Sequence, residues 1–207
     1  MVDLSVLVLF IPTFFLVSVT PGMCMMLAMT MGMTIGIRQT LWMMLGELTG
    51  VALVAVSAVI GIAAVMLAYP SVFTVLKWLG GCYLVFLGIQ MWLSRGRMSI
   101  PQGQEKSQAV SAKELAVQGF VTAVVNPKGW AFFIALLPPF IRADYALVPQ
   151  LVVLISLILL LESICLLIYA SGGKTLGYLL QKSSHVRVMN RVAGSLMLLV
   201  GLWLILG

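Results

Sequence analysis

The sequence predicts an all-α integral membrane protein whose six transmembrane helices form two inverted three-helix repeats, with helices 1 and 4 broken. Three observations predict this fold. Only 9% of the 207 residues are charged, against about 25% in soluble domains, and 62% are apolar. Residues 4–37 and 48–76 carry no charge, and each stretch exceeds the roughly 20 apolar residues that cross a bilayer. Proline interrupts the first and fourth predicted spans at matching positions.

Hydropathy places one membrane span in each of six apolar segments. The predicted spans are 5–30, 41–68, 72–93, 115–137, 147–170 and 188–207. The stretch 94–114, rich in Ser, Gln and charge, predicts a flexible linker between the third and fourth spans. We therefore expect one transmembrane domain, 1–207, made of a first repeat, 1–93, this cytoplasmic linker, and a second repeat, 115–207.

Basic residues gather on one side of these spans and predict the orientation. The loops after spans 1, 3 and 5 hold Arg38, Arg95, Arg97, Lys106, Lys113, Lys174, Lys182, Arg187 and Arg191; the opposite side holds Lys77 and Arg142. Basic loops face the cytoplasm, so both termini are predicted to be periplasmic. The first span should be retained, because Asp3 replaces the positive charge of a signal peptide. The dispersal of basic residues argues against a nucleic-acid partner.

The two halves resemble each other when they are aligned on their prolines and glycines. "FFLVSVTPG" (14–22) matches "FVTAVVNPKG" (120–129), and in each the first phenylalanine stands seven residues before the proline. "LGGCYLVFLG" (79–88) matches "VAGSLMLLVG" (192–201), and both contain glycines seven residues apart. A three-span unit that is repeated once inserts in opposite orientations, which is the plan of many secondary transporters.

The two proline interruptions predict a binding site near the membrane midplane. Proline lacks the N–H of a helical hydrogen bond, and the carbonyl groups it frees are tolerated only where they face protein or water. Free helix N-termini suit a carboxylate, and C-terminal carbonyls suit a cation. The breaks are expected to be shaped by Pro21, Gly22, Pro127 and Gly129, with Thr20, Asn126 and Lys128 as polar groups of the site.

Lys128 lies fourteen residues from both Glu114 and Arg142, which places it about 20 Å from either end of a helical span. A lysine at the midplane costs about 2.5 to 3.5 kcal/mol unless it meets a partner or a water-filled cavity. Glu47 and Glu162 are the available intramembrane acids, one in the second span of each half. They are candidates for exchanging protons or binding an amine, and Lys128 for binding a carboxylate. A structural ion pair, or a lysine that reaches the interface, is the alternative.

Together these motifs resemble the LysE superfamily, most closely its RhtB/LeuE-like amino-acid exporters. The resemblance covers the whole chain, and "NPKG" after an apolar span is its most specific element. It implies a six-span protein of the bacterial inner membrane that exports amino acids or small derivatives, driven by the proton gradient through alternating access. It implies no cofactor and no enzymatic activity.

Two positions depart from the family pattern. Met23-Cys24 follow Pro21-Gly22 where the family usually reads PGP and then Asn or Asp. Val51 takes the place of the acid in the family's GxxxGD. Glu47, one turn earlier on the same helix face, is expected to compensate.

Other classes are suggested by single features. "MCMMLAMTMGM" (23–33) is dense in sulfur, which suits Cu(I) in a soft-metal exporter, although methionine also fills cores and no second such cluster follows. An enzyme would need a motif such as HExxH, and His185 falls in a predicted basic loop.

The cysteines and glycines bear on two further readings. A thiol carrier would need a partner in span 4 for Cys24, and we expect Cys24, Cys82 and Cys165 to be packing residues rather than metal ligands. A non-transport membrane subunit remains an alternative. Small-residue faces that include Gly80, Gly81 and Gly88 could pack within one subunit or in a homo-oligomer.

Overall fold

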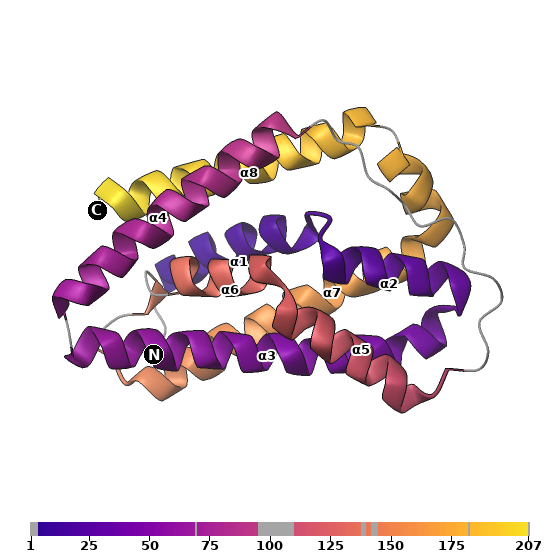
Figure 1. Cartoon of the computed structure of the whole chain (residues 1–207), viewed down its shortest axis with the longest axis horizontal. Coiled ribbons are helices and arrows are strands. Elements are labelled where there is room, and N and C mark those ends of the chain that lie inside the picture. The colour runs from indigo at the N-terminus through magenta and orange to yellow at the C-terminus, as the bar shows by residue number, and fades with distance from the viewer. Residues whose placement is uncertain are drawn as a thin grey trace.

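The computed structural model describes residues 4–68, 70–94, 110–137, 140–141, 145–181 and 183–206. Its helices are α1 (Leu4–Val19), α2 (Met23–Thr34), α3 (Ile37–Ala68), α4 (Pro70–Leu93), α5 (Ala112–Val125), α6 (Pro127–Leu136), α7 (Leu147–Gln181) and α8 (Ser183–Leu206). Within the ranges just given there is no β-strand, which confirms the all-α prediction (Figure 1). Residues 95–109 of the predicted linker lie outside the described part of the chain.

The helices lie where the six spans are predicted. Two spans are divided: α1 and α2 share the first, and α5 and α6 share the fourth. In Figure 1 the successive spans run between the left and right ends of the molecule in alternating directions. By length and composition, Ile37–Gly61 and Leu147–Gly173 could cross a membrane, as could the bent pair of α1 and α2 as a third span. The count of six spans stays a prediction.

The predicted loop between spans 5 and 6 is wrong in its extent. Helix α7 continues to Gln181, and it kinks at Gly173, whose φ of 27° is in the left-handed region that favours glycine. Lys174 therefore belongs to α7, and His185, Arg187 and Arg191 belong to α8. Basic residues in this stretch are compatible with a helix, because a helix that has passed the end of the hydrocarbon can continue in water.

Helices α4 and α8 pack closely along one side of the molecule, at the top of Figure 1. Gly81 faces Gly201 and Gly88 faces Gly194; a Cβ atom added at Gly88 would lie only 2.8 Å from the carbonyl oxygen of Gly194. The numbering rises along one helix as it falls along the other, so the pair is antiparallel. Glycine is what allows two backbones to approach this closely.

Small residues also join the two halves at α3 and α5. A Cβ atom added at Gly46 would lie 1.8 Å from the carbonyl oxygen of Ala116. One added at Gly119 would lie 2.0 Å from the carbonyl oxygen of Met43. Helix α2 approaches α7 in the same way, where Gly32 meets the backbone of Ala170. These contacts hold the halves of the divided spans against the long helices α3 and α7.

Two apolar clusters form the core. One contains the buried phenylalanines Phe10, Phe14, Phe132, Phe133 and Phe140 together with aliphatic residues of α3 and α7. The other contains Met25, Met29, Met31, Met43 and Met44 with residues of α7. Most of the sulfur-dense stretch therefore packs in a core, as methionine commonly does.

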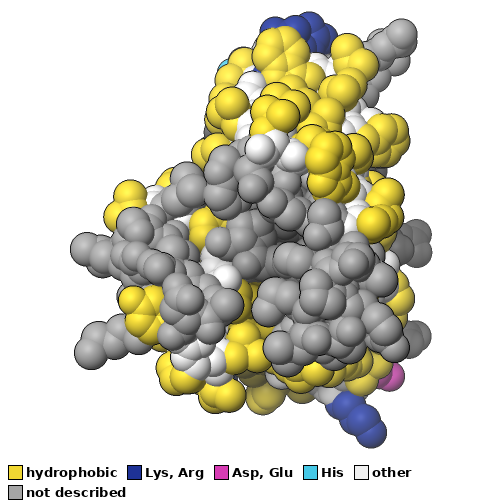
Figure 2. Space-filling view, turned by 90° about the vertical axis from the view of Figure 1, so that its left-hand side faces the viewer, with side chains coloured by type: hydrophobic (Ala, Val, Ile, Leu, Met, Phe, Trp, Pro, Cys, Tyr) yellow, Lys and Arg dark blue, Asp and Glu magenta, His cyan; other side chains and the backbone are white. Residues whose placement is uncertain are grey.

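The outer surface of the described residues is apolar. Helix α3 exposes Leu41, Trp42, Leu45 and Leu53, and α4 and α7 expose comparable large side chains. Figure 2 shows hydrophobic side chains over most of the described surface of one face, with Lys and Arg at its margins. A surface of this kind is stable in lipid rather than in water.

Candidate functional site

The first helix break follows Val19. The axes of α1 and α2 differ in direction by 57°, and Gly22 in extended conformation precedes α2. Side chains take over the carbonyl groups at the end of α1: the Thr20 hydroxyl donates to Leu16 O at 2.7 Å, and the Tyr169 hydroxyl donates to Val19 O at 2.8 Å. The predicted interruption at Thr20-Pro21-Gly22 is confirmed.

The second break is centred on Asn126. Its side-chain oxygen accepts a hydrogen bond from the backbone N–H of Lys128 at 3.1 Å and so caps the start of α6. Pro127 occupies the first helical position, where its missing N–H costs nothing. The Trp130 indole donates to Val124 O at 2.8 Å, near the end of α5. The predicted helix break at Asn-Pro-Lys-Gly is also confirmed.

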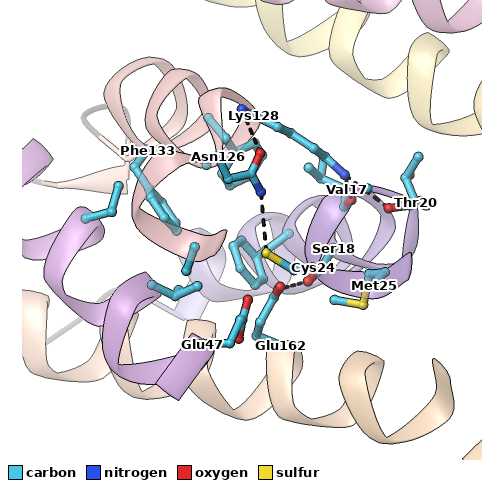
Figure 3. A pocket seen from close by; sticks show the side chains of 17 residues that line it. Val17, Ser18, Thr20, Cys24, Met25, Glu47, Asn126, Lys128, Phe133 and Glu162 are labelled. Atoms are coloured by element: carbon cyan, nitrogen blue, oxygen red, sulfur yellow. Dashed lines mark hydrogen bonds between the residues drawn. The ribbon is translucent and has the colours of Figure 1, made fainter. Parts of the chain in front are cut away.

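Lys128 connects the two breaks. Its ammonium group donates to Val17 O at 2.9 Å and to Thr20 O at 3.1 Å (Figure 3). Val17 O is the acceptor that the N–H of residue 21 would bond in a continuous helix, and Pro21 has no N–H. Lys128 therefore caps the C-terminus of α1, where a cation is favoured. These backbone carbonyls are partners that the sequence analysis did not name.

Glu47 and Glu162 approach the same region from α3 and α7. Glu162 accepts a hydrogen bond from the Ser18 hydroxyl. Glu47 is completely buried; its carboxyl group lies next to the Cys24 thiol and the Glu162 carboxyl group but makes no hydrogen bond of good geometry. The two carboxyl groups interact electrostatically, and Figure 3 shows them beside each other below the Lys128 bridge. A buried carboxyl group without a hydrogen bond is costly, so the position of Glu47 is not explained by packing alone.

Lys128, Glu47 and Glu162 line one cavity, which we call the central cavity. Its volume is about 60 Å³, which is room for water but not for a bound amino acid. The predicted site residues that line it are Thr20, Gly22, Glu47, Asn126, Lys128, Gly129 and Glu162. Pro21 lines a neighbouring cavity, and Pro127 is exposed at the start of α6. Val51 lines the central cavity with Glu47, which confirms that they share a helix face.

Two polar residues of the cavity are missing from the predicted site. Ser18 is signalled only by being polar within an apolar run. Cys24, predicted to be a packing residue, is buried but lines the cavity, and its sulfur accepts a hydrogen bond from Asn126 Nδ2 at 3.6 Å. The sequence does hint at this role for Cys24, because Cys24 occupies the position where the family pattern has Asn or Asp.

Phenylalanine rings close the cavity on the side of α1 and α6. The ring of Phe14 lies 5.4 Å from Phe132 and 6.4 Å from Phe133, between ring centroids. Phe10 continues the stack toward Phe140 at 5.0 Å. All of these rings are buried, so they form an apolar barrier next to a polar cavity. We call this cluster the phenylalanine barrier.

The comparison with known families decides the class of the protein. A model of the LysE type translocator family matches residues 15–207. The chain belongs to the LysE type translocator family. It is therefore a membrane transporter, as the resemblance implies. Among the described residues, no group of three or more His, Cys, Asp or Glu side chains could hold a metal ion.

Several curated proteins are similar to this LysE-family chain over most of its length. It is 29% identical to an uncharacterized membrane protein of Vibrio cholerae over 202 residues, which cover 98% of the chain and 97% of the relative. It is 26% identical to the homoserine/homoserine lactone efflux protein of Salmonella typhimurium over 186 residues, which cover 90% and 89%. No solved structure gives a significant match.

Proposed function

We propose that this LysE-family transporter exports small amino acids or their derivatives across the bacterial inner membrane by proton antiport with alternating access. The observation that carries the proposal is the central cavity, where both helix breaks present an ammonium group opposite two carboxyl groups. A zwitterionic amino acid carries the complementary pair of charges. The name of the Salmonella relative, an efflux protein for homoserine and its lactone, supports the same direction and class of substrate.

The two acids supply a simple means of coupling. Neighbouring carboxylates repel each other in a site of low dielectric constant, and a proton or a cationic ligand relieves the repulsion. The ammonium group of a substrate and a proton then compete for Glu47 and Glu162. Substrate leaves outward when a proton replaces it, and the proton leaves inward when the next substrate arrives. This competition is an exchange, as antiport requires.

The contacts between α4 and α8 support the inverted-repeat architecture. The alignment of the halves equates Gly81 with Gly194 and Gly88 with Gly201. Exchanging the halves therefore turns the Gly81–Gly201 contact into the Gly194–Gly88 contact, which is also present. Reciprocal contacts of this kind are typical of two-fold symmetry. They favour two repeats, 1–93 and 115–207, that move relative to each other around the cavity.

The predicted orientation gives each side of the cavity a role. With both termini in the periplasm and the loops after spans 1, 3 and 5 in the cytoplasm, α1 begins and α6 ends on the outer side. The phenylalanine barrier then separates the central cavity from the periplasm. In this proposal the arrangement is one that is closed toward the periplasm.

Efflux of labelled amino acids tests the proposal. Cells that express the protein are loaded with a panel including L-homoserine, and efflux is followed with and without a proton uncoupler. We expect uncoupler-sensitive efflux of one or a few small amino acids, which Glu162→Gln abolishes at equal membrane abundance and Gln118→Leu, exposed on α5, leaves unchanged. If no amino acid is exported by protein that is present in the membrane, the proposal is wrong. Soft cations come next, because Cys24 and Met25 line the cavity.

A further inference from the structure

A second cavity lies on the other side of the bridge between Lys128 and Thr20. Its volume is about 290 Å³, close to the roughly 300 Å³ of the smallest typical ligand pockets. One wall is the break in span 1, and the opposite wall comes from α4 and α8. The polar residues that line it are Thr20, Lys128, Gln90, Ser94 and Asn190. Thr20 and Lys128 line both cavities, so their hydrogen bond stands between them.

The lining selects for one kind of ligand. Among the described residues of the lining, Lys128 contributes the charge, none is Asp or Glu, and the remaining polar groups are amides and hydroxyls. The ammonium group of Lys128 has three N–H donors, of which Val17 O and Thr20 O take two. One donor is left for a carboxylate. A carboxylate with a neutral polar side chain fits these groups, and a basic side chain would meet only a cation.

The depth of the cavity indicates how a ligand reaches it. It extends from Pro21, at the break, to Ser94 and Asn190, which are joined by a hydrogen bond from Asn190 Nδ2 to Ser94 Oγ at 3.1 Å. Ser94 directly follows α4, and Asn190 lies in the second turn of α8. In the predicted orientation both belong to the cytoplasmic side. The central cavity, by contrast, is bordered by the Lys128 bridge on this side and by the phenylalanine barrier on the other.

We propose that the second cavity is a loading subsite, where the substrate binds through its carboxylate to Lys128 before it enters the central cavity. This inference rests on the proposed function. The carboxylate is a stronger acceptor for an ammonium group than the neutral carbonyls of Val17 and Thr20. Binding therefore draws Lys128 off the end of α1 and opens the bridge. Gln90 and Asn190 hold the neutral polar groups of the substrate and so contribute to affinity rather than to the rate of transfer.

Uptake of L-homoserine into inside-out membrane vesicles tests the subsite. The double variant Gln90→Leu, Asn190→Leu removes two amides without touching the central cavity, and Gln118→Leu is the matched control outside both cavities. Loss of two neutral hydrogen bonds predicts a KM raised about 5- to 50-fold, with the maximal rate retained. Unchanged KM in the double variant would overturn the inference and leave the proposed function standing.

A labelling experiment reads the same subsite without transport. Ser94→Cys in a Cys82→Ser background places a thiol on the cavity wall, while the native Cys24 and Cys165 are buried. A membrane-impermeant thiol reagent should modify it in inside-out vesicles. L-Homoserine should slow the modification, and its methyl ester, which lacks the carboxylate, should not. Equal rates with both would contradict carboxylate binding. Protection without any uptake would instead contradict the exporter and keep the subsite.

Discussion

The ammonium group of Lys128 lies 2.9 Å from the carbonyl oxygen of Val17, which is the oxygen that Pro21 deprives of its helical partner. A proline in one half of the chain creates the acceptor, and a lysine in the other half fills it. The residues are separated by 111 positions in sequence. The two breaks are thus held together by one side chain, and a movement that separates them must first release it.

Replacing Lys128 tests that link. Lys128→Gln removes the charge and shortens the side chain, so the two carbonyls lose charge-assisted hydrogen bonds of about 1.5 to 3 kcal/mol each. We expect normal insertion, a lower thermal unfolding midpoint in detergent, and efflux reduced about tenfold or more. Lys128→Arg, which keeps the charge, should recover most of the midpoint. Full efflux by Lys128→Gln would remove the residue from the mechanism.

Glu47 should show the opposite relation between stability and transport. Its carboxyl group is buried without a hydrogen-bond partner, a situation that costs about 1 to 3 kcal/mol. Glu47→Leu should therefore leave the free energy of unfolding equal or higher, while proton-coupled efflux is lost. Thermal unfolding and efflux are measured on the same preparations. A clearly destabilised Glu47→Leu protein would mean that the carboxyl group has a structural partner.

The phenylalanine barrier should limit leakage. Phe14→Ala removes a ring that contacts both Phe132 and Phe133, at a cost of about 3 to 5 kcal/mol, and Phe14→Leu keeps more of the core volume. We expect both variants to raise uncoupler-insensitive efflux, with the larger rise in Phe14→Ala. Phe86→Ala, on the exposed face of α4, is the control. Leakage that is no greater in the Phe14 variants than in Phe86→Ala would contradict the barrier.

The contact between α4 and α8 should be intolerant of a single methyl group. A Cβ atom added at Gly88 would lie 2.8 Å from Gly194 O and 2.8 Å from Leu198 Cγ, and a backbone oxygen cannot move aside as the end of a flexible side chain can. Gly88→Ala is expected to cost about 1 to 3 kcal/mol of unfolding free energy. An added Cβ at Gly61 has no atom of the described residues within 4 Å, so Gly61→Ala should be neutral or stabilising by about 0.5 to 1 kcal/mol. Similar unfolding midpoints for the two variants would contradict close packing at Gly88.

The start of α5 predicts a pH effect outside the membrane. Ser111 caps this helix, and its backbone and side-chain hydrogen bonds to Glu114 lower the pKa of that carboxyl below its usual 4.5. Because the pKa of Glu114 is lower in the folded state than in the unfolded state, its ionised carboxyl group stabilises the folded protein at pH values above the unfolded-state pKa. This stabilisation is lost as the pH falls through the folded-state pKa. Glu114→Gln should therefore unfold more readily than the wild type at neutral pH. The difference should vanish in acid; a difference that persists there would argue against the cap.

Local chemistry explains what the sequence predicted well. The breaks at Pro21 and Asn126-Pro127 were predictable because proline restricts its own backbone and that of the preceding residue wherever it stands. Glu47 and Val51 were predictable as neighbours because residues four apart share a helix face. The glycines seven apart marked close packing, but only the structure shows that each glycine pair meets the other pair.

Long-range partners explain what the sequence did not predict. The acceptors of Lys128 are backbone carbonyls: Pro21 predicts that span 1 has such groups, but not that a side chain of span 4 reaches them. Glu47 and Glu162 are the partners that the sequence suggests, because carboxylates are visible in it. The continuation of α7 past Gly173 was missed because hydropathy reports where lipid ends, not where a helix ends. Cys24 was missed because its hydrogen bond comes from Asn126, on another helix.

The cap on α1 also makes insertion of the fourth span depend on the first span. Span 1 emerges before span 4, so the acceptors at Val17 and Thr20 are waiting when Lys128 reaches the translocon. A nascent chain that lacks residues 1–22 would present Lys128 to hydrocarbon with no acceptor, at about the 2.5 to 3.5 kcal/mol of an unpaired lysine. Its fourth span would then fail to insert more often, and membrane quality-control proteases would degrade more of the chain.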